Sequence, residues 1–249
     1  RSSDLGHHFL VSNADHIYEE GIANRYLRRN PGQLVGDATE SISDHGDACE
    51  VLPISRNPEN QLLTDVGVIT SACGITDYLG GAFPDAFNHD VTFVCEPVSN
   101  LVHVDRLKDN GAAFTASRVL DHQEFLASTD AWFRPVNLYI GPDGALYVVD
   151  YYREVIEHPE WMSESAAKAG NLYNGRDKGR IYRIAAIGAS AASWTTHLNL
   201  DDSTDAQLVQ KLASPNIWWR SNAQRLLVDR DHQAAVPALE QMAGNTQFP

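Results

Sequence analysis

Three oxygen-bearing side chains occupy equivalent places in three similar segments of the sequence. Asn13, Glu96 and Asp150 each end a short run of apolar, β-branched and aromatic residues. Ca²⁺ is a hard cation that takes oxygen ligands, so three such side chains meeting at one place would suit it. The alternative is that they only cap strand ends or accept hydrogen bonds from turn amides. The pattern therefore predicts either a calcium site or three structural caps.

A second group of reactive side chains lies in the segment 151–179, which is dense in aromatic and charged residues and contains Tyr152 and Arg153. A long excursion between two strands is more often functional than a short connection. We expect it to form a lid in which the Arg153 guanidinium binds an anionic substrate or cofactor carboxylate. The alternative is a surface ion pair, because Arg153 and Glu157 are four residues apart.

A third candidate is Arg134, which lies between bulky aromatic residues and a proline. An arginine fixed in this way would be presented rigidly to a planar, carboxylated ring that stacks on Trp132. Together with Tyr152, these two residues form the predicted cofactor-binding set. The alternative is a buried structural pair between Arg134 and Asp130.

Removal of a proton from an alcohol needs a general base with a pKa near neutrality, and histidine is the usual choice. His16, His45 and His103 lie on or near the ends of predicted strands. We take His16 as the candidate base, which with Arg134 and Arg153 completes the predicted catalytic set. The alternative is that these histidines satisfy turns or hydrogen bonds in the core.

The cysteines and the short motifs exclude several chemistries. Cys49, Cys73 and Cys95 are far apart, so they are either buried thiols or one disulfide with one remaining thiol. The sequence has no CxxCH motif and hence no haem attachment site in this chain. It also has no GxGxxG, P-loop, HExxH or GxSxG motif, which leaves nucleotide, zinc-protease and serine-hydrolase functions without support.

The elements that would position these residues are short strands in pairs. The apolar runs 8–13, 92–96 and 145–150 are each followed by a second, alternating segment, namely 16–19, 100–104 and 180–184. This pattern, without helical periodicity, predicts antiparallel all-β structure. The sequence Gly-Pro-Asp-Gly at 141–144 predicts a tight turn before the third run.

Recurrence on this scale is typical of a β-propeller, whose four-stranded blades are about 40–50 residues long. We predict a mainly β fold in which residues 1–185 form the C-terminal part of a propeller with about three to four blades. The uneven spacing of the runs would reflect either long insertions or an unrecognised blade in residues 20–90, and further blades would precede residue 1. Polar strand ends would then gather around the central channel.

The character of the chain changes after residue 185. Residues 186–203 are rich in Ala and Ser and predict a linker. Residues 204–249 predict short helices that start at a capping box at Thr204, at Ser214-Pro215 and at Asp231, the last ending at Gly244. Paired short helices of this kind indicate the start of a HEAT-like helical repeat.

The charge balance restricts the partners. Lys and Arg number 19 and Asp and Glu 33, which gives a formal net charge of −14. Nucleic acids and anionic membranes bind basic surfaces, so we predict neither as a partner. No apolar run approaches the roughly 18 residues of a membrane span. The chain opens at Arg1 without a signal-like segment, and we expect it to be part of a longer protein.

Several long motifs carry a resemblance to a known family. They are FVCEPVSNLVH at 93–103, the run 125–137 with FLASTDAWFRPVN, GPDGALYVVDYYREVIEHPEW at 141–161 and GRDKGRIYRI at 175–184. The chain resembles the membrane-bound dehydrogenase family of large exported bacterial proteins. The resemblance implies a propeller similar to quinoprotein sugar dehydrogenases, HEAT-like repeats and, commonly, a C-terminal cytochrome c domain.

This resemblance implies a periplasmic or cell-surface oxidoreductase module that oxidises a sugar or related alcohol and passes electrons to a cytochrome c domain or protein. It also implies pyrroloquinoline quinone and Ca²⁺ as cofactors. Two alternatives stay open. One is a non-catalytic scaffold in which propeller and solenoid both serve as binding surfaces. The other is a Ca²⁺-dependent propeller hydrolase or lactonase.

Overall fold

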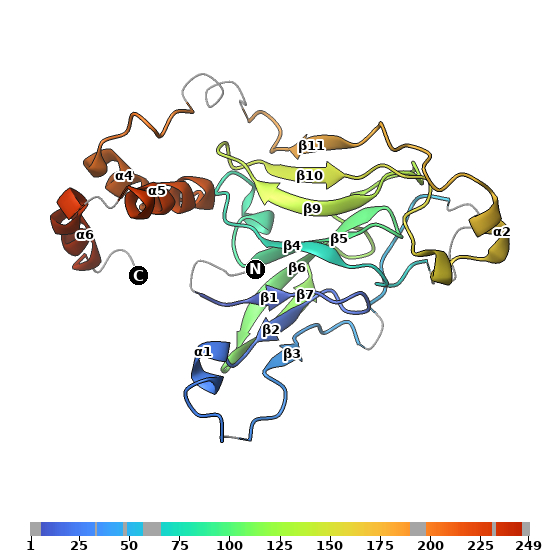
Figure 1. Cartoon of the computed structure of the whole chain (residues 1–249), viewed down its shortest axis with the longest axis horizontal. Helices are drawn as coiled ribbons and strands as arrows, with labels where there is room; N and C mark the ends of the chain where they lie inside the picture. The colour runs from blue at the N-terminus through green and yellow to red at the C-terminus, as the bar shows by residue number, and fades with distance from the viewer. Residues whose placement is uncertain are drawn as a thin grey trace. The chain divides into compact units, whose positions relative to one another are not determined.

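The computed structural model describes residues 6–32, 34–46, 49–56, 66–189, 198–230 and 233–245 (Figure 1). Its strands form three antiparallel sheets, which confirms the prediction of a mainly β protein. The chain divides into two compact units. The first unit contains residues 1–78, 89–139 and 147–183, and the second contains residues 79–88, 140–146 and 184–249. The candidate site described below lies in the first unit.

The N-terminal sheet is a three-stranded meander in the order β1-β2-β3. Its strands are β1 (Phe9–Leu10), β2 (Tyr18–Glu20) and β3 (Thr39–Ser41), and the short helix α1 (Asn24–Leu27) lies between the last two. Phe9 pairs with Glu19, and Glu19 pairs in turn with Glu40. The predicted pairing of the first apolar run with the segment that follows it is therefore confirmed.

The largest sheet has five strands. It contains β4 (Cys73–Asp77), β5 (Val91–Glu96), β6 (Leu101–Asn110), β7 (Ala113–Arg118) and β8 (Leu126–Ala127), with β8 paired to β6. Every residue of β5 is buried, as its continuous apolar run predicts. β5 pairs with β6 over its full length, from Val91 opposite Arg106 to Glu96 opposite Leu101. The second predicted strand pair is thus also confirmed.

The third sheet has the order β11-β10-β9, with β9 (Pro135–Ile140), β10 (Leu146–Asp150) and β11 (Arg180–Ile184). The predicted turn joins β9 to β10, because the Gly141 N–H donates to the Ala145 carbonyl at 3.0 Å and Gly144 takes a φ of +77°. Between β10 and β11 the chain forms a 3-10 turn (Pro159–Trp161) and the helix α2 (Glu164–Lys168). The third predicted strand pair is confirmed across this excursion.

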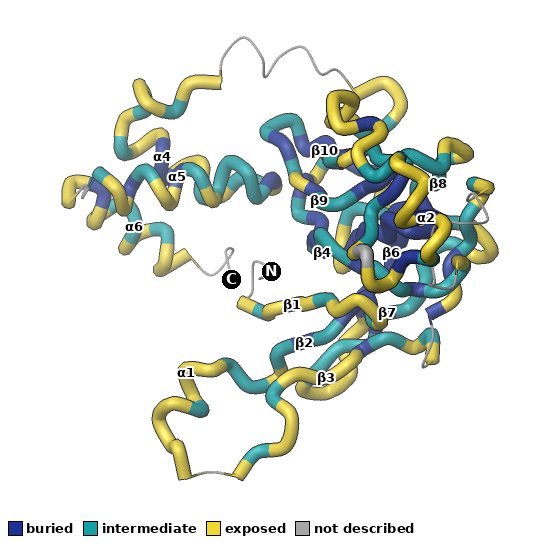
Figure 2. Tube along the Cα trace, turned by 45° about the vertical axis from the view of Figure 1, so that its right-hand side comes forward, coloured by how far each residue is buried: buried dark blue, intermediate teal, exposed yellow. Residues whose placement is uncertain are grey.

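Residues 20–90, for which we expected either long insertions or an unrecognised blade, contribute strands to two different sheets. β3 closes the N-terminal sheet, and β4 opens the five-stranded sheet. The main core of the first unit contains side chains from both of these sheets and from the chain between them. Buried residues are dark blue in Figure 2. Its buried members are Phe9, Ile17, Ile42, Cys49, Val51, Ile69, Ala72, Ile75, Val94, Leu101, Leu107 and Ala116. Burial of each large aliphatic or aromatic side chain contributes about 1.5–3 kcal/mol to stability.

The second unit contains three α-helices among its described residues: α4 (Asp205–Lys211), α5 (Ile217–Asp229) and α6 (Val236–Ala243). The capping box at Thr204 is confirmed, because Thr204 and Gln207 exchange side-chain and backbone hydrogen bonds. The predicted start of α5 at Ser214-Pro215 is wrong. Asn216 caps this helix instead, since its Oδ1 accepts from the Trp218 amide at 2.8 Å while its Nδ2 donates to the Gly141 carbonyl at 2.9 Å.

Two further helix predictions have different outcomes. Asp231 lies outside the described residues, whereas α6 ends at Gly244 as predicted. The helices share a small core around Leu208, Ala223 and Leu227. None of the described helices has both the length and the apolar character that a membrane span requires.

Candidate functional site

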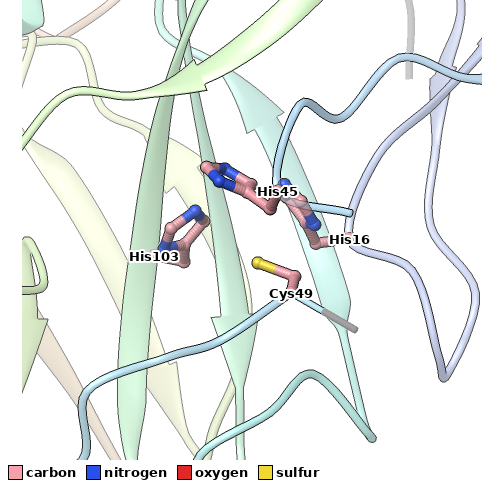
Figure 3. Close-up of side chains that lie close together, drawn as sticks. All are labelled: His16, His45, Cys49 and His103. Atoms are coloured by element: carbon pink, nitrogen blue, oxygen red, sulfur yellow. The ribbon is translucent and has the colours of Figure 1, made fainter. Parts of the chain in front are cut away.

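Three histidines and one cysteine meet in the interior of the first unit. His16, His45, Cys49 and His103 each offer one ligand atom, and these four atoms lie within 4.8 Å of one another. Figure 3 shows the three imidazole rings and the sulfur grouped around a common point. His16, Cys49 and His103 are buried, and the His45 side chain is 11% exposed. We call these four residues the His₃Cys cluster.

The four side chains come from three separate parts of the chain. His16 lies just before β2, His45 and Cys49 lie beyond β3, and His103 lies on β6. The backbone near His45 is fixed to β7, because the Asp44 N–H donates to the Ala116 carbonyl at 3.1 Å. The Cys49 carbonyl accepts the Ile69 N–H at 2.9 Å. Regular backbone hydrogen bonds therefore hold these two ligands in position.

Asp105 contacts all three histidines of the cluster. Residues two apart on a strand point to the same face, so β6 directs His103 and Asp105 to the same side. Oδ1 of Asp105 lies 2.9 Å from Nε2 of His45 and 3.0 Å from Nε2 of His103. Oδ2 lies 2.6 Å from Nε2 of His16. All three Nε2 atoms thus face one buried carboxylate.

The spacing of the rings matches the spacing around a metal ion. The ring centres of His16 and His45 are 5.1 Å apart, those of His16 and His103 are 5.1 Å apart, and those of His45 and His103 are 5.4 Å apart. A tetrahedral ion bonded to imidazole nitrogens at about 2.0 Å holds the ring centres about 5.2 Å from one another. The ring separations are therefore compatible with three imidazoles bound to one ion.

Each imidazole also has a carboxylate on its outer side. Nδ1 of His103 lies 2.7 Å from Oε2 of Glu124. Nδ1 of His45 lies 3.5 Å from Oδ1 of Asp44, and Nδ1 of His16 lies 3.8 Å from Oδ1 of Asp15. Metal-binding histidines usually donate their second ring N–H to a carboxylate or carbonyl, which fixes the tautomer. The Glu124–His103 pair has this arrangement, whereas the other two contacts are longer and are not hydrogen bonds.

Glu124 is itself held in place by two further groups. Its Oε1 accepts from the Arg118 guanidinium at 2.8 Å and from the Leu52 N–H at 3.1 Å. Burial alone would raise the pKa of Glu124, but the hydrogen bond from His103 and the charge of Arg118 hold it below its ordinary value. Glu124 is therefore an anion that orients His103 from behind.

The two buried anions and the buried histidines shift the pKa values of one another. Burial would raise the pKa of Asp105, yet the hydrogen bonds from His103, His16 and His45 hold it well below its ordinary value. Burial also acts to lower the pKa of His103, but its bonds to Asp105 and Glu124 raise that pKa to about 9. For His16, burial outweighs the contact with Asp105, and its pKa is lowered. Without a metal ion, the second proton of His103 is retained between two carboxylates.

Cys49 has the properties of a thiol that ionises only when a cation arrives. Burial, followed by the negative charge of Asp105, raises its pKa to about 12. Thiolates become good ligands when a metal ion displaces their proton. Imidazole and thiolate together favour zinc and the neighbouring transition metals over Ca²⁺ and Mg²⁺, which take oxygen. The donor set of the cluster fits a divalent transition-metal ion.

The histidines named from the sequence are thus brought together. His16, our candidate base, shares the cluster with His45 and His103, which we named beside it. Its Nε2 contacts Asp105, and its buried Nδ1 has no hydrogen-bond partner in the described part of the chain. These contacts place His16 in a metal-binding arrangement. Its role as a general base stays a prediction.

The two arginines of the predicted catalytic set bind backbone carbonyls. Arg134 is fully buried, and its guanidinium donates to the carbonyls of Pro97 at 2.9 Å, Glu154 at 2.8 Å and Arg153 at 3.1 Å. Burial lowers its pKa to about 10. The Arg153 guanidinium donates to the carbonyl of Gly175 at 2.6 Å and lies 4.3 Å from the centre of the Tyr151 ring. Both arginines therefore hold the backbone of the 151–179 segment through hydrogen bonds to its carbonyl groups.

The predicted cofactor-binding aromatics, Trp132 and Tyr152, are both half-buried. Trp132 lines a cavity of about 600 Å³ with Tyr173 and Lys178 among its other walls. The Tyr152 hydroxyl lies 3.1 Å from Oδ2 of Asp130, and the Arg180 guanidinium covers its ring at 3.9 Å. The structure therefore places Trp132 beside an open cavity and Tyr152 under an arginine.

The predicted calcium ligands contact backbone amides. Oε2 of Glu96 accepts the N–H groups of Thr70 at 3.3 Å and Ser71 at 3.0 Å. Oδ1 of Asp150 accepts the N–H groups of Arg134 and Tyr152, each at 2.9 Å. These contacts are those of the capping alternative. Asn13 is exposed and borders a cavity of about 400 Å³, and the calcium site stays a prediction.

The remaining sequence expectations concern the cysteines. All three cysteines are thiols, with Cys49 and Cys95 buried and Cys73 half-buried. Cys49 is one of the buried thiols that the sequence predicted, and it also belongs to the His₃Cys cluster. The alternation His103-Val104-Asp105 was the available signal for Asp105, because it directs both polar side chains of a buried strand to one face. No local pattern indicated Cys49 or Glu124.

Comparison with known proteins gives one match. No curated protein and no solved structure matches the chain. A family model matches residues 1–187, which include every residue of the His₃Cys cluster, Asp105 and Glu124. The chain belongs to the family described as a domain of unknown function, DUF7133.

Proposed function

We propose that this chain binds one divalent transition-metal ion through Nε2 of His16, His45 and His103 and the thiolate of Cys49. The observation that carries the proposal is the convergence of three imidazoles and a thiol whose ligand atoms lie within 4.8 Å of one another. Histidine and cysteine together form the usual donor sets for zinc and its neighbours in proteins. Buried histidines that serve only as hydrogen-bonded core residues have no need to meet a thiol at one point.

The surroundings of the cluster support the same function. A ligating imidazole must be neutral at the metal side, and Glu124 at 2.7 Å from Nδ1 stabilises the tautomer of His103 that leaves Nε2 for the ion. His16, Cys49 and His103 are buried, and Cys49 belongs to the main core, so little water can compete for the ion. A bound cation would also compensate the buried negative charge of Asp105.

The expected role of the ion follows from where its ligands lie. The cluster connects three parts of the chain, namely the stretch before β2, the stretch after β3, and β6 itself. The first two adjoin strands of the N-terminal sheet, and β6 belongs to the five-stranded sheet. Because four protein ligands surround a buried point, the centre is of the closed type that stabilises a fold or holds a redox ion. We therefore expect the ion to fix the N-terminal sheet to the five-stranded sheet.

The test is metal titration of the purified wild-type chain and matched variants, after removal of bound metal with a chelator. We expect wild type to take up one Zn²⁺ or Co²⁺ ion per chain. The variants Cys49→Ser and His45→Ala should bind at least ten-fold more weakly, because each removes one ligand. The control variants Cys73→Ser and His158→Ala, which change a half-buried thiol and an exposed histidine outside the cluster, should bind as wild type does. Equal binding by all five proteins would refute the proposal.

We also propose, from the sequence resemblance, the wider setting of this centre. In this proposal the chain is part of a β-propeller of about three to four blades, followed by HEAT-like helices, in an exported oxidoreductase. That protein would oxidise a sugar or related alcohol and pass electrons to a cytochrome c. What supports it is the set of long motifs at 93–103, 125–137, 141–161 and 175–184.

This second proposal is tested with the longest available form of the protein, an artificial electron acceptor and a panel of sugars and alcohols. Acceptor reduction that requires pyrroloquinoline quinone and Ca²⁺ would support it. Turnover that needs Ca²⁺ but no acceptor would favour a hydrolase or lactonase. Retention of a protein partner without any turnover would favour a binding scaffold.

A further inference from the structure

We infer that Asp105 is a fifth ligand of the metal ion, so that the centre has three nitrogen donors, one sulfur donor and one oxygen donor. This inference rests on the proposed metal-binding function. It makes Asp105 the residue that determines which ions the centre accepts.

The first step concerns protons. An imidazole nitrogen that binds a metal ion gives its lone pair to the ion and carries no hydrogen. The contacts of Asp105 with Nε2 of His16, His45 and His103, at 2.6, 2.9 and 3.0 Å, are hydrogen bonds only while those nitrogens are protonated. When the ion binds, the three Nε2 atoms lose their hydrogens. Three nitrogen lone pairs and the carboxylate oxygens would then face one another with no hydrogen atom between them. Repulsion would follow unless the ion lies between them.

The second step concerns the freedom of Asp105 to move away. Asp105 is 1% exposed and lies within β6, paired with Thr92 on β5 and with Arg118 on β7. In the described part of the chain, its side-chain hydrogen bonds come from the three imidazoles. A carboxylate turned away from the ion would be buried without a partner, which is costly. The Asp105 carboxylate therefore stays beside the three imidazoles.

The third step concerns distance. Two ligands bonded to one ion at about 2.0–2.1 Å and at right angles to each other lie about 2.9 Å apart. Oδ1 of Asp105 is 2.9 Å from Nε2 of His45 and 3.0 Å from Nε2 of His103. One oxygen atom thus already stands in ligand-to-ligand contact with two imidazoles. Asp105 is outside the group of four residues whose ligand atoms lie within 4.8 Å of one another, so binding of all five to one ion requires a shift of the carboxylate or of the Cys49 side chain.

The fourth step concerns charge. A divalent ion bound by one thiolate and one carboxylate makes a neutral buried unit, whereas three imidazoles add no charge. Outside this unit, Glu124 is balanced by Arg118 at 2.8 Å. Binding of a monovalent ion would leave a net negative charge in the core. The arrangement therefore favours a divalent ion.

The ligand set then defines the class of ion. Carboxylate is a hard donor that does not suit Cu⁺, and structural Zn²⁺ is almost always four-coordinate. Five mixed donors suit divalent ions that accept a larger coordination number, namely Fe²⁺, Co²⁺ and Cu²⁺. Five protein ligands leave no coordination position for a substrate in a five-coordinate centre. We therefore assign the centre to a five-coordinate divalent transition metal with no substrate bound to it.

The test uses Co²⁺ as the probe, because its visible absorption reports both sulfur ligation and coordination number. In the metal-free wild-type chain, added Co²⁺ should produce a thiolate charge-transfer band and the weak visible bands of five-coordinate Co²⁺. In Asp105→Asn, the charge-transfer band should remain while the visible bands become several-fold stronger, as four-coordinate Co²⁺ requires. The affinity should fall by about 10–100-fold, the range seen when groups around a metal are removed.

The control variant is Asp109→Asn, which changes an exposed carboxylate on the same strand. It should have the wild-type spectrum. Strong four-coordinate bands in the wild-type chain would overturn the role of Asp105 and leave the metal site intact. Absence of the charge-transfer band in the wild-type chain would instead overturn the proposed function. Because the wild-type spectrum alone reports coordination number, the test decides even if Asp105→Asn does not fold.

Discussion

At the scale of single residues, the proposed metal centre depends on pairs in which one side chain fixes the state of another. Glu124 contacts Nδ1 of His103 at 2.7 Å, and Arg118 contacts Glu124 at 2.8 Å. The outer carboxylate keeps the ring nitrogen on the metal side available as a ligand. These outer residues belong to the site as much as the ligands do.

We expect Glu124→Gln to weaken metal binding by about 10–100-fold, because the amide removes the negative charge behind His103. Competition titration with a coloured chelator measures this change directly. Glu160→Gln, at an exposed position, is the matched control and should leave the affinity unchanged. Unchanged affinity in Glu124→Gln would show that the outer carboxylate has no part in metal binding.

Arg134 offers a second prediction at this scale. Its guanidinium donates to three backbone carbonyls in the interior, on Pro97, Arg153 and Glu154. We expect Arg134→Met to lower the free energy of unfolding by about 3 kcal/mol or more, because buried acceptors lose their donors at about 1–3 kcal/mol each. Urea denaturation measures the loss. A loss below about 1 kcal/mol would contradict a structural role and favour the predicted role of Arg134 in binding.

At the scale of elements, the sequence predicted the strands that carry a clear local pattern. The apolar run of β5, the alternation of β6 and the Gly-Pro-Asp-Gly turn before β10 were sufficient to pair the strands correctly. β3 and β4 were not recognised, because neither is a run of strand-forming apolar residues. β3 is Thr-Glu-Ser and fully exposed, and β4 contains Gly74. Tertiary pairing, which the sequence does not display, decides both strands.

Gly74 gives a prediction for one of these strands. It has a φ of +62°, and a Cβ at this position would lie 2.7 Å from Cα of Asn137 on β9. Gly74→Ala should lower the free energy of unfolding by several kcal/mol, since the added atom meets backbone that cannot give way. Thermal or urea unfolding measures the effect.

Gly111→Ala is the matched control for this prediction. Its φ is +71°, but a Cβ there would meet no atom within 4 Å. It should cost only the penalty of a left-handed backbone, about 1–2 kcal/mol. Equal losses in the two variants would show that the close approach of β4 and β9 does not limit stability.

At the scale of the whole molecule, the site is a product of tertiary structure. His16, His45, Cys49 and His103 come from three separate parts of the chain, and no spacing rule for metal ligands connects them. The sequence indicated the three histidines as chemically interesting but assigned the metal to Asn13, Glu96 and Asp150. That assignment followed strand ends, where polar residues are also needed as caps, and the structure gives Glu96 and Asp150 backbone amides as partners.

The ion should also stabilise the chain as a whole, since ligands from two sheets or their connections bind it. An ion present at about 1,000 times its dissociation constant adds about 4.1 kcal/mol to the free energy of unfolding. We therefore expect the unfolding midpoint of the metal-free chain to rise on addition of Co²⁺ or Zn²⁺. In Cys49→Ser the rise should be much smaller. An equal rise in both proteins would place the stabilising ion elsewhere.

The most direct measurement of the central claim is elemental analysis of the wild-type chain and Cys49→Ser, purified in parallel without added metal or chelator. We predict about one transition-metal ion per wild-type chain and a clear loss of that ion in Cys49→Ser. Iron, cobalt or copper would agree with Asp105 as a fifth ligand, whereas zinc would favour a four-coordinate centre. The same content of transition metal in both proteins, or calcium alone, would contradict a metal centre at His16, His45, Cys49 and His103.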